Sequence, residues 1–149
     1  MINSVFNTQL PVAVGSDHAG YEYKALVIKM LADAGWQIAD KGTHSQESCD
    51  YPDYAHAVAT AVETGAAAFG ILICGSGNGV AITANKHKGI RAALCWNEEL
   101  ARLARSHNDA NVLCIPARFI STDTALAMVQ DFFTTAFEGG RHQKRVDKI

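Results

Sequence analysis

The sequence predicts an α/β protein of the three-layer, Rossmann-like class, built on a five-stranded parallel sheet. Short apolar runs bounded by glycine alternate with longer amphipathic stretches, and this alternation is typical of repeated strand–helix units. Five such units follow one another with no linker, internal repeat or low-complexity stretch between them. We therefore expect one domain over residues 1–149, with residues 1–10 as an N-terminal extension and residues 138–149 as a basic C-terminal tail.

Hydrophobic period and turn residues place the elements in order. The predicted strands are 11–15, 36–42, 67–75, 89–95 and 111–117. The predicted helices are 21–35, 51–65, 80–87, 97–106 and 121–137, and the tail 141–149 can continue as a helix. In the first helix, Leu26, Met30 and Leu31 fall on one face, which we expect to meet the core, and Gly35 is its stop signal. The order of the strands in the sheet does not follow from one sequence.

Composition sets limits on the class of protein. A chain of 149 residues is long enough to bury an apolar core in one domain. Its formal net charge of -2 gives no whole-molecule field that would steer it onto nucleic acid or a membrane. The chain has no window near the roughly 18 apolar residues of a spanning helix and no leader-like start, so we expect a soluble, cytoplasmic protein. Its 4 cysteines have no CxxC spacing and are expected to be free thiols.

Two loops are candidate binding sites because ligands bind beyond the carboxyl ends of the strands in open parallel sheets. The stretch GSDHAG after the first strand offers Asp17 and His18, and CGSGNG after the third offers Cys74, Ser76 and exposed backbone amides. Glycines let N–H groups approach a ligand, and the following helix start adds partial positive charge, so this loop suits an oxyanion. The loop lacks the Lys-Ser/Thr of a P-loop and does not follow the first strand, so a nucleotide-binding module is a minor alternative.

Each of these residues also has a purely structural interpretation. Buried free cysteine often packs as a small hydrophobe, and position alone does not decide between this and a reactive Cys74. The helix start beside Cys74 favours a thiolate, which would accept a proton. Asp17 is equally well explained as a cap of the next helix, with His18 on the surface.

The stretch ARSHNDAN places His107 and Asn108 between a helix and the strand that follows it. In a parallel α/β fold this junction lies at the amino end of the sheet, away from Cys74 of the same chain. His107 is therefore either structural or reaches the pocket of a neighbouring subunit. Arg141 and Arg145 are four residues apart, on one helical face, and suit a phosphate, although a solvated basic tail explains them as well.

Taken together, the motifs resemble the type B ribose-5-phosphate isomerase family, which also includes galactose-6-phosphate and allose-6-phosphate isomerases. The resemblance covers nearly everything from Val12 to Val146. Five stretches carry it, in the family's order and spacing: GSDHAG, DYPDYA, GILICGSGNGVAITANKHKGIRAA, ARLARSHNDANVL and GGRHQKRV. The family works as dimers or tetramers whose pockets use two chains. The resemblance thus implies a homodimer or homotetramer, in agreement with the position of His107.

The resemblance implies roles for individual residues. Cys74 is the base that moves a proton between C1 and C2 of the sugar, Ser76 assists proton traffic at the oxygens, and His107 opens the furanose ring. Asp17 joins this catalytic set as a partner of the sugar. The implied substrate-binding residues are His18, Tyr51, Gly75, Gly77, Asn78, Gly79, Asn108, Arg118, Arg141 and Arg145. Among them, His18 and the arginines are implied phosphate ligands, and the glycine-loop amides hold the enediolate oxygen.

Three departures from the family pattern stand out. One branch of the family lacks the cysteine and uses a glutamate just after the glycine loop; Val80 holds that place here, which leaves Cys74 as the only base on offer. Pro116 and Ala117 precede Arg118 where glycine is common. The first ten residues are longer than many members carry, and the sequence assigns them no role.

Aldose–ketose isomerisation through an enediolate needs a base, donors for the oxygen that gains charge, and a handle for the substrate. All three are on offer without a metal, and no cluster of carboxylates and histidines suggests a divalent cation. We therefore expect an enzyme without metal or cofactor that interconverts ribose 5-phosphate and ribulose 5-phosphate in the pentose phosphate pathway, with no nucleic-acid or membrane partner. The alternatives are an isomerase of allose 6-phosphate or galactose 6-phosphate, and a non-catalytic module that binds a nucleotide or sugar phosphate.

Overall fold

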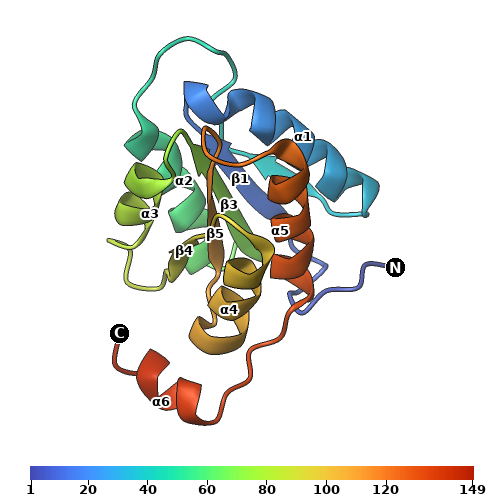
Figure 1. The fold of residues 1–149 in the computed structure, drawn as a ribbon, viewed down its shortest axis with the longest axis vertical. Helices are drawn as coiled ribbons and strands as arrows, with labels where there is room; N and C mark the ends of the chain where they lie inside the picture. The colour runs from blue at the N-terminus through green and yellow to red at the C-terminus, as the bar shows by residue number, and fades with distance from the viewer.

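The computed structural model describes residues 1–149 and contains one parallel sheet between two helical layers (Figure 1). The strands, in sheet order, are β2 (Ile38–Asp40), β1 (Val12–Ser16), β3 (Phe69–Cys74), β5 (Val112–Pro116) and β4 (Ala92–Leu94). Every neighbouring pair of strands is parallel. The predicted Rossmann-like fold with a five-stranded parallel sheet is therefore confirmed, and the structure adds the strand order.

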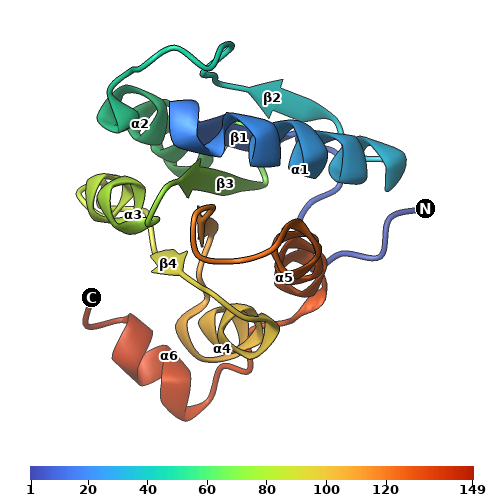
Figure 2. The same ribbon diagram turned by 45° about the horizontal axis from the view of Figure 1, so that its top comes forward.

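The helices lie on the two faces that right-handed crossovers dictate. They are the 3-10 turn η1 (His18–Gly20), α1 (Tyr21–Asp33), α2 (Tyr51–Glu63), α3 (Asn78–Ala84), α4 (Glu98–Asn108), α5 (Thr122–Thr134) and α6 (Arg141–Val146). The chain crosses the sheet in one direction through α1 and α4 and in the other through α2 and α3. Because crossovers between parallel strands are right-handed, opposite directions place helices on opposite faces. Accordingly α1, α5 and α4 pack side by side on one face, and α2 packs on α3 on the other (Figure 2).

The three central strands are buried on both faces, which is why they read as continuous apolar runs. Alternate residues of β3 serve the two layers: Ile71 and Ile73 join the core under α1, α4 and α5, whereas Leu72 and Cys74 join the core under α2 and α3. Each fully buried Ile or Leu contributes about 1.5–3 kcal/mol. Because Cys74 is the last residue of this central strand, a fully buried strand holds it in position.

The predicted core face of the first helix is wrong at Leu26, which is 42% exposed. The buried face of α1 instead carries Lys24, Val27 and Leu31. Lys24 is 3% exposed, and its ammonium group lies 2.6 Å from an Asp40 carboxylate oxygen, so that the charge is paired at the end of β2. The helix is apolar around most of its circumference, and the pattern of apolar residues therefore did not select the face.

The N-terminal extension packs across the amino end of the sheet. The Val5 N–H donates to the Phe133 carbonyl at 2.9 Å. The Phe6 ring stacks on Phe69, the first residue of β3, with ring centroids 4.5 Å apart. This segment, to which the sequence assigned no role, therefore covers the core at the amino end of β3, next to α5. None of the helices has the length and apolar character that crossing a membrane requires.

Candidate active site

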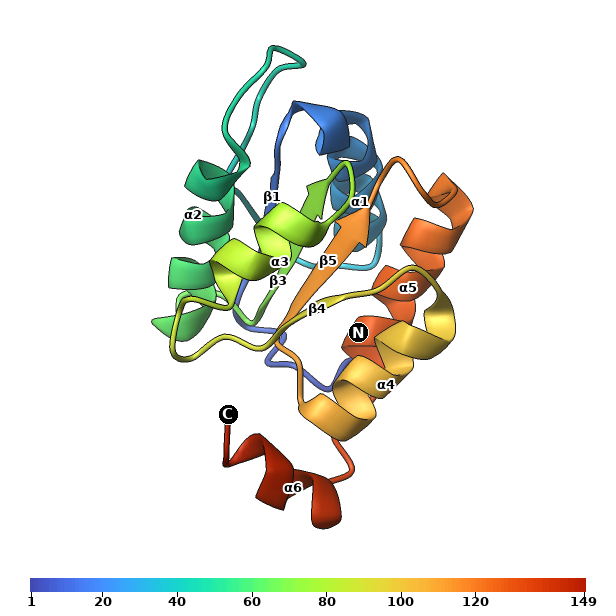
Figure 3. The same ribbon diagram turned by 60° about the vertical axis from the view of Figure 1, so that its left-hand side comes forward.

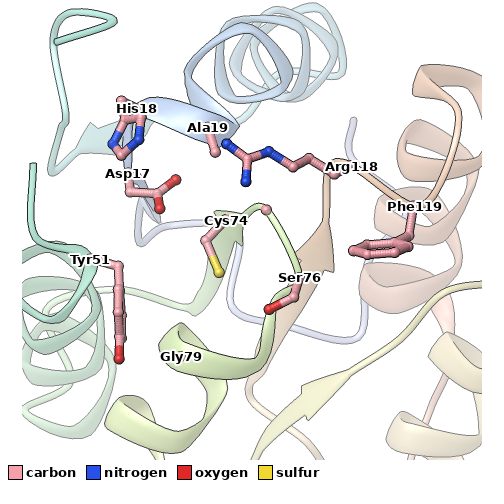
Figure 4. A pocket seen from close by; sticks show the side chains of 10 residues that line it. Asp17, His18, Ala19, Tyr51, Cys74, Ser76, Gly79, Arg118 and Phe119 are labelled. Carbon is pink, nitrogen blue, oxygen red and sulfur yellow. The ribbon is translucent and has the colours of Figure 1, made fainter. Parts of the chain in front are cut away.

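A cavity of about 530 Å³ opens at the carboxyl ends of β1, β3 and β5 (Figure 4). Its lining residues are Asp17, His18, Ala19, Tyr51, Cys74, Gly75, Ser76, Gly79, Arg118 and Phe119. The chain leaves the neighbouring strands β1 and β3 toward opposite faces of the sheet, which opens a crevice between them. Such a switch point is where open parallel sheets bind ligands.

Cys74 lies at the floor of this cavity and is 5% exposed. Figure 4 shows its sulfur directed into the space between Tyr51 and Ser76. The Gly77 N–H donates to the Cys74 sulfur at 3.2 Å, and the Cys74 carbonyl accepts a hydrogen bond of 2.9 Å from the Ala117 N–H. The glycine loop thus holds the sulfur, the loop after β5 holds the backbone of the same residue, and the sulfur borders the cavity with an N–H group directed at it.

At two positions of the glycine loop after β3, a side chain would overlap a neighbouring residue. Gly77 has a φ of +76°, in the left-handed region, and a Cβ there would overlap Leu94. A Cβ at Gly79 would overlap the ring of Tyr51, so the tyrosine lies directly against the start of α3. Ser76 is exposed at the tip of the loop, where its hydroxyl accepts the Asn78 N–H at 3.3 Å.

Asp17 and His18 form the opposite wall, after β1. An Asp17 carboxylate oxygen accepts the Gly20 N–H at 3.1 Å, which confirms the capping interpretation, although the same residue also lines the cavity. The His18 Nδ1 accepts the Cys49 N–H at 3.3 Å. A neutral His18 therefore carries its proton on Nε2 and can donate it to an anion. His18 is half-buried and lines the cavity, so it lies where a substrate-binding residue is expected.

Arg118 supplies an unpaired positive charge at the rim. Its N–H donates to the Gly75 carbonyl at 3.0 Å, which docks the loop after β5 on the glycine loop despite Pro116 and Ala117. Its guanidinium reaches over the cavity toward Asp17 and lies within 3.2 Å of the place where a Gly75 side chain would begin (Figure 4). No carboxylate forms an ion pair with Arg118. This cation is free to bind a ligand anion.

His107, Asn108, Arg141 and Arg145 are not in this cavity. Figure 3 shows α6 beyond the end of α4, on the side from which β3 and β5 point away. His107 and Asn108 form the last turn of α4 rather than the connection after it, and Asn108 lines a separate cavity beside β4. Arg141 and Arg145 are exposed on α6 and form no ion pair. As the sequence predicted for His107, all four lie away from Cys74 of their own chain.

A histidine pair fastens α6 to α4. The rings of His107 and His142 stack with centroids 4.1 Å apart and an angle of 14° between their planes. A Glu138 carboxylate oxygen lies 4.0 Å from Nε2 of His107 and 3.6 Å from Nε2 of His142. Burial and the neighbouring positive charges of His107 and Arg141 lower the pKa of His142, while Glu138 opposes this.

The same three side chains, His107, Glu138 and His142, are the one group whose nitrogen and oxygen atoms lie close enough to hold a metal ion, within 4.8 Å of one another. The two imidazole planes are nearly parallel, so their in-plane lone pairs do not converge on one point. The observed arrangement suits a stacked pair beside a carboxylate better than a metal centre.

Sequence reasoning missed Ala19 and Phe119 in the cavity and His142 in the stack. Phe119 is 74% exposed and follows the carboxyl end of β5. The rule that pointed to the loops after the first and third strands applies equally to the loop after the fifth, so a signal for Phe119 was present.

Comparison with known proteins places the chain in a family. Residues 12–149 match the profile of the family described as Ribose/Galactose Isomerase. A probable ribose-5-phosphate isomerase B from Mycoplasma pneumoniae is 48% identical over 140 residues, covering 93% of this chain and 92% of that protein. The crystal structure of a ribose 5-phosphate isomerase from Thermotoga maritima matches with a TM-score of 0.91 and 48% identity, covering 93% of this chain and 96% of the other.

A ribose-5-phosphate isomerase B from Mycoplasma genitalium, solved with bound ribulose-5-phosphate, matches with a TM-score of 0.92 and 41% identity over 95% of each chain. The resemblance seen in the sequence is therefore confirmed across nearly the whole molecule. The chain belongs to the ribose/galactose isomerase family and is an isomerase.

Proposed function

We propose that the protein interconverts ribose 5-phosphate and ribulose 5-phosphate by proton transfer through an enediolate at Cys74, a step of the pentose phosphate pathway. The observation that carries the proposal is the cavity itself. A cysteine sulfur borders it beside a loop of exposed backbone amides, and an unpaired arginine stands at its rim. The five-carbon substrate is supported by the relatives named for it and by the one that holds ribulose-5-phosphate.

In the proposed reaction the Cys74 thiolate removes the proton from C2 of the open-chain aldose. The electron pair moves to the C1 oxygen, where the loop amides of residues 75–79 stabilise the negative charge. Ser76 assists the transfer of the hydroxyl proton from O2 to O1. The Cys74 thiol then returns its proton to C1, which gives the ketose and restores the thiolate. Hydrogen moves within one molecule, and the steps balance without an external oxidant or reductant.

Substrate orientation falls to the walls of the cavity. His18 offers an N–H, and Arg118 a guanidinium, to the phosphate group. Asp17 and Tyr51 border the same space and are proposed to contact the sugar. Fixing the phosphate at one end places C2 against the sulfur, and such positioning supplies a large part of enzymatic rate enhancement.

Ring opening is the one proposed step whose residue, His107, lies away from the cavity of its own chain. We propose that His107, assisted by Asn108, performs this step in the pocket of a second copy, where Arg141 and Arg145 also bind the phosphate. The two exposed arginines without ion pairs support this assignment. The functional unit is then a homodimer or homotetramer in which the α4–α6 end of one chain completes the cavity of another.

The test of the base is Cys74→Ala, with Cys114→Ala as matched control. Cys114 lies in the neighbouring strand β5, is fully buried and borders no cavity; burial raises its pKa well above the usual value, so it stays a thiol. Cys74→Ala should lose roughly 10²–10⁴-fold in turnover and in exchange of the C1 proton of ribulose 5-phosphate with solvent, while still binding substrate. Cys114→Ala should retain both activities. Exchange that survives in Cys74→Ala would place the base elsewhere.

The test of the shared pocket is complementation. Inactive Cys74→Ala and His107→Ala proteins are mixed and allowed to exchange subunits, and activity should return because one pocket of each hybrid is complete. No recovery would contradict sharing. Turnover of ribose 5-phosphate, allose 6-phosphate and galactose 6-phosphate by the wild-type protein decides the chain length of the sugar, and saturable ATP or NAD binding without turnover would favour the nucleotide-binding alternative.

A further inference from the structure

A buried arginine joins three segments at the amino end of the sheet. Arg105, in the third turn of α4, is 4% exposed. Its Nε donates to the Thr135 carbonyl at 3.2 Å, and its Nη1 donates to the Ala110 carbonyl at 2.6 Å and to an Asp109 carboxylate oxygen at 3.0 Å. The side chain therefore ties the end of α4 to the residues before β5 and to the end of α5.

The face of this guanidinium is covered by the N-terminal extension. The Phe6 ring centroid lies 4.5 Å from the Arg105 Cζ, at the distance of a cation–π contact, and Phe132 lies at 5.8 Å. Phe6 also stacks on Phe69, and the Val5–Phe133 backbone hydrogen bond fixes the segment on α5. The family match begins at residue 12, so this contact is made by a part of the chain outside it.

The residues next to Arg105 carry the C-terminal tail. The carbonyl of Ser106 accepts the Glu138 N–H at 3.0 Å, and His107 stacks on His142. The helix α6 packs on α4 and stands clear of the sheet (Figure 3). The placement of α6 therefore depends on the last turns of α4, and these in turn are held by Arg105.

We propose that Phe6 is a positioning residue: by covering Arg105 it holds the α4–α6 end of its own chain in place for the pocket of the partner. The inference rests on the shared pocket of the proposed function and extends it to the N-terminal segment. Phe6 would thus influence the pocket of the partner chain, which the α4–α6 end of its own chain completes, without contacting the substrate.

The experiment adds Phe6→Ala to only one of the two complementing proteins, Cys74→Ala or His107→Ala, at a time. In a hybrid of Cys74→Ala and His107→Ala chains, the one complete pocket takes Cys74 from the second chain and His107 from the first. Phe6→Ala in the Cys74→Ala chain should lower recovered activity roughly 2- to 10-fold, the loss expected for one partly buried cation–π contact. The same substitution in the His107→Ala chain should leave recovered activity close to that of the parental pair.

If Phe6 merely fills the core, Phe6→Ala should lower the recovered activity equally whichever chain carries it. Equal losses in the two hybrids, or no loss in either, would overturn the proposal. If the parental pair recovers nothing, the shared pocket itself fails, and the positioning role fails with it. Phe6→Leu, which keeps the apolar volume but not the aromatic face, guards against a variant that does not fold and should show a smaller loss on the same side.

Amide hydrogen exchange supplies a local measurement. Residues 138–149 of Phe6→Ala should exchange faster than those of wild type, while the amides of α2, on the other face of the sheet, should be unchanged. Tail amides that exchange as slowly as in wild type would overturn the proposal. This outcome does not depend on catalysis and so is separate from any failure of the proposed function.

Discussion

Replacing Gly79 with alanine should separate the stability of the protein from its activity. Gly79 is the second residue of α3, and a Cβ there would overlap the ring of Tyr51. Alanine favours a helix over glycine by about 1 kcal/mol, whereas overpacking a rigid neighbour costs about 1–3 kcal/mol. Tyr51 is 40% exposed, so its ring can turn away. We therefore expect the free energy of unfolding to change by no more than about 1 kcal/mol.

The effect on catalysis should be larger, because Tyr51 and Gly79 both line the cavity beside Cys74. Displacing the ring by an ångström or more removes one wall from the substrate, and misplacement of this size costs up to about 10²-fold in rate. We expect kcat/KM for ribose 5-phosphate to fall roughly tenfold or more. Urea unfolding followed by tryptophan fluorescence, together with steady-state isomerase assays, measures the two quantities.

A double-mutant cycle isolates the cause. In Tyr51→Ala the clash partner is absent, so adding Gly79→Ala should change kcat/KM little further. Gly65→Ala is the control: nothing lies within 4 Å of its Cβ position, but its φ of +79° is unfavourable for alanine, so stability should fall by about 1–2 kcal/mol with activity unchanged. Full activity in Gly79→Ala, or losses that add independently with Tyr51→Ala, would refute the steric reasoning.

Three further predictions follow from buried charges and thiols. Burial raises the pKa of Cys95 to about 12 and that of Cys114 well above its usual value, so in native protein at pH 8 iodoacetamide should modify neither; mass spectrometry detects any labelling. The pKa of His142 is lowered in the folded protein, so the unfolded chain binds the extra proton more readily, and thermal melting should show stability falling as pH drops below about 6.5. His142→Gln should weaken this dependence. Lys24→Met should cost about 1–3 kcal/mol in urea unfolding, because Asp40, 34% exposed in its side chain, loses its partner; an unchanged midpoint would show that the pair contributes nothing.

Local sequence patterns predicted the strands and helices well because short apolar runs bounded by glycine alternate with longer amphipathic stretches. They failed where packing against neighbouring elements decides which residues are buried, and where a helix ends without its usual stop signal. In α1 both Leu26 and Val27 are apolar, and packing against the sheet and α5 decides that Val27 is the buried one. The end of α4 was placed at residue 106, but the helix continues to Asn108 and stops at Asp109 with a φ of +48°. No glycine marks that stop, so the usual signal was missing.

For the candidate site, the rule that ligands bind at the carboxyl ends of strands identified the loops after β1 and β3. The structure brings Asp17, His18, Cys74 and Arg118 around one cavity. The role of residues 1–10 could not be predicted, because the contact between Phe6 and Arg105 joins positions about a hundred residues apart and leaves no local pattern.

Cys74 and His107 lie at opposite ends of one sheet, so the proposed sharing of a pocket restricts how copies can associate. A head-to-tail arrangement would complete one pocket per contact and leave a free end on each copy, so that copies would add until a ring closed or a filament formed. A two-fold arrangement lets each molecule give and receive at the same contact, and two finished pockets close the assembly. On the proposed shared pocket, turnover should fall on dilution as the pairs dissociate, because a single copy carries Cys74 and His107 but cannot bring them together.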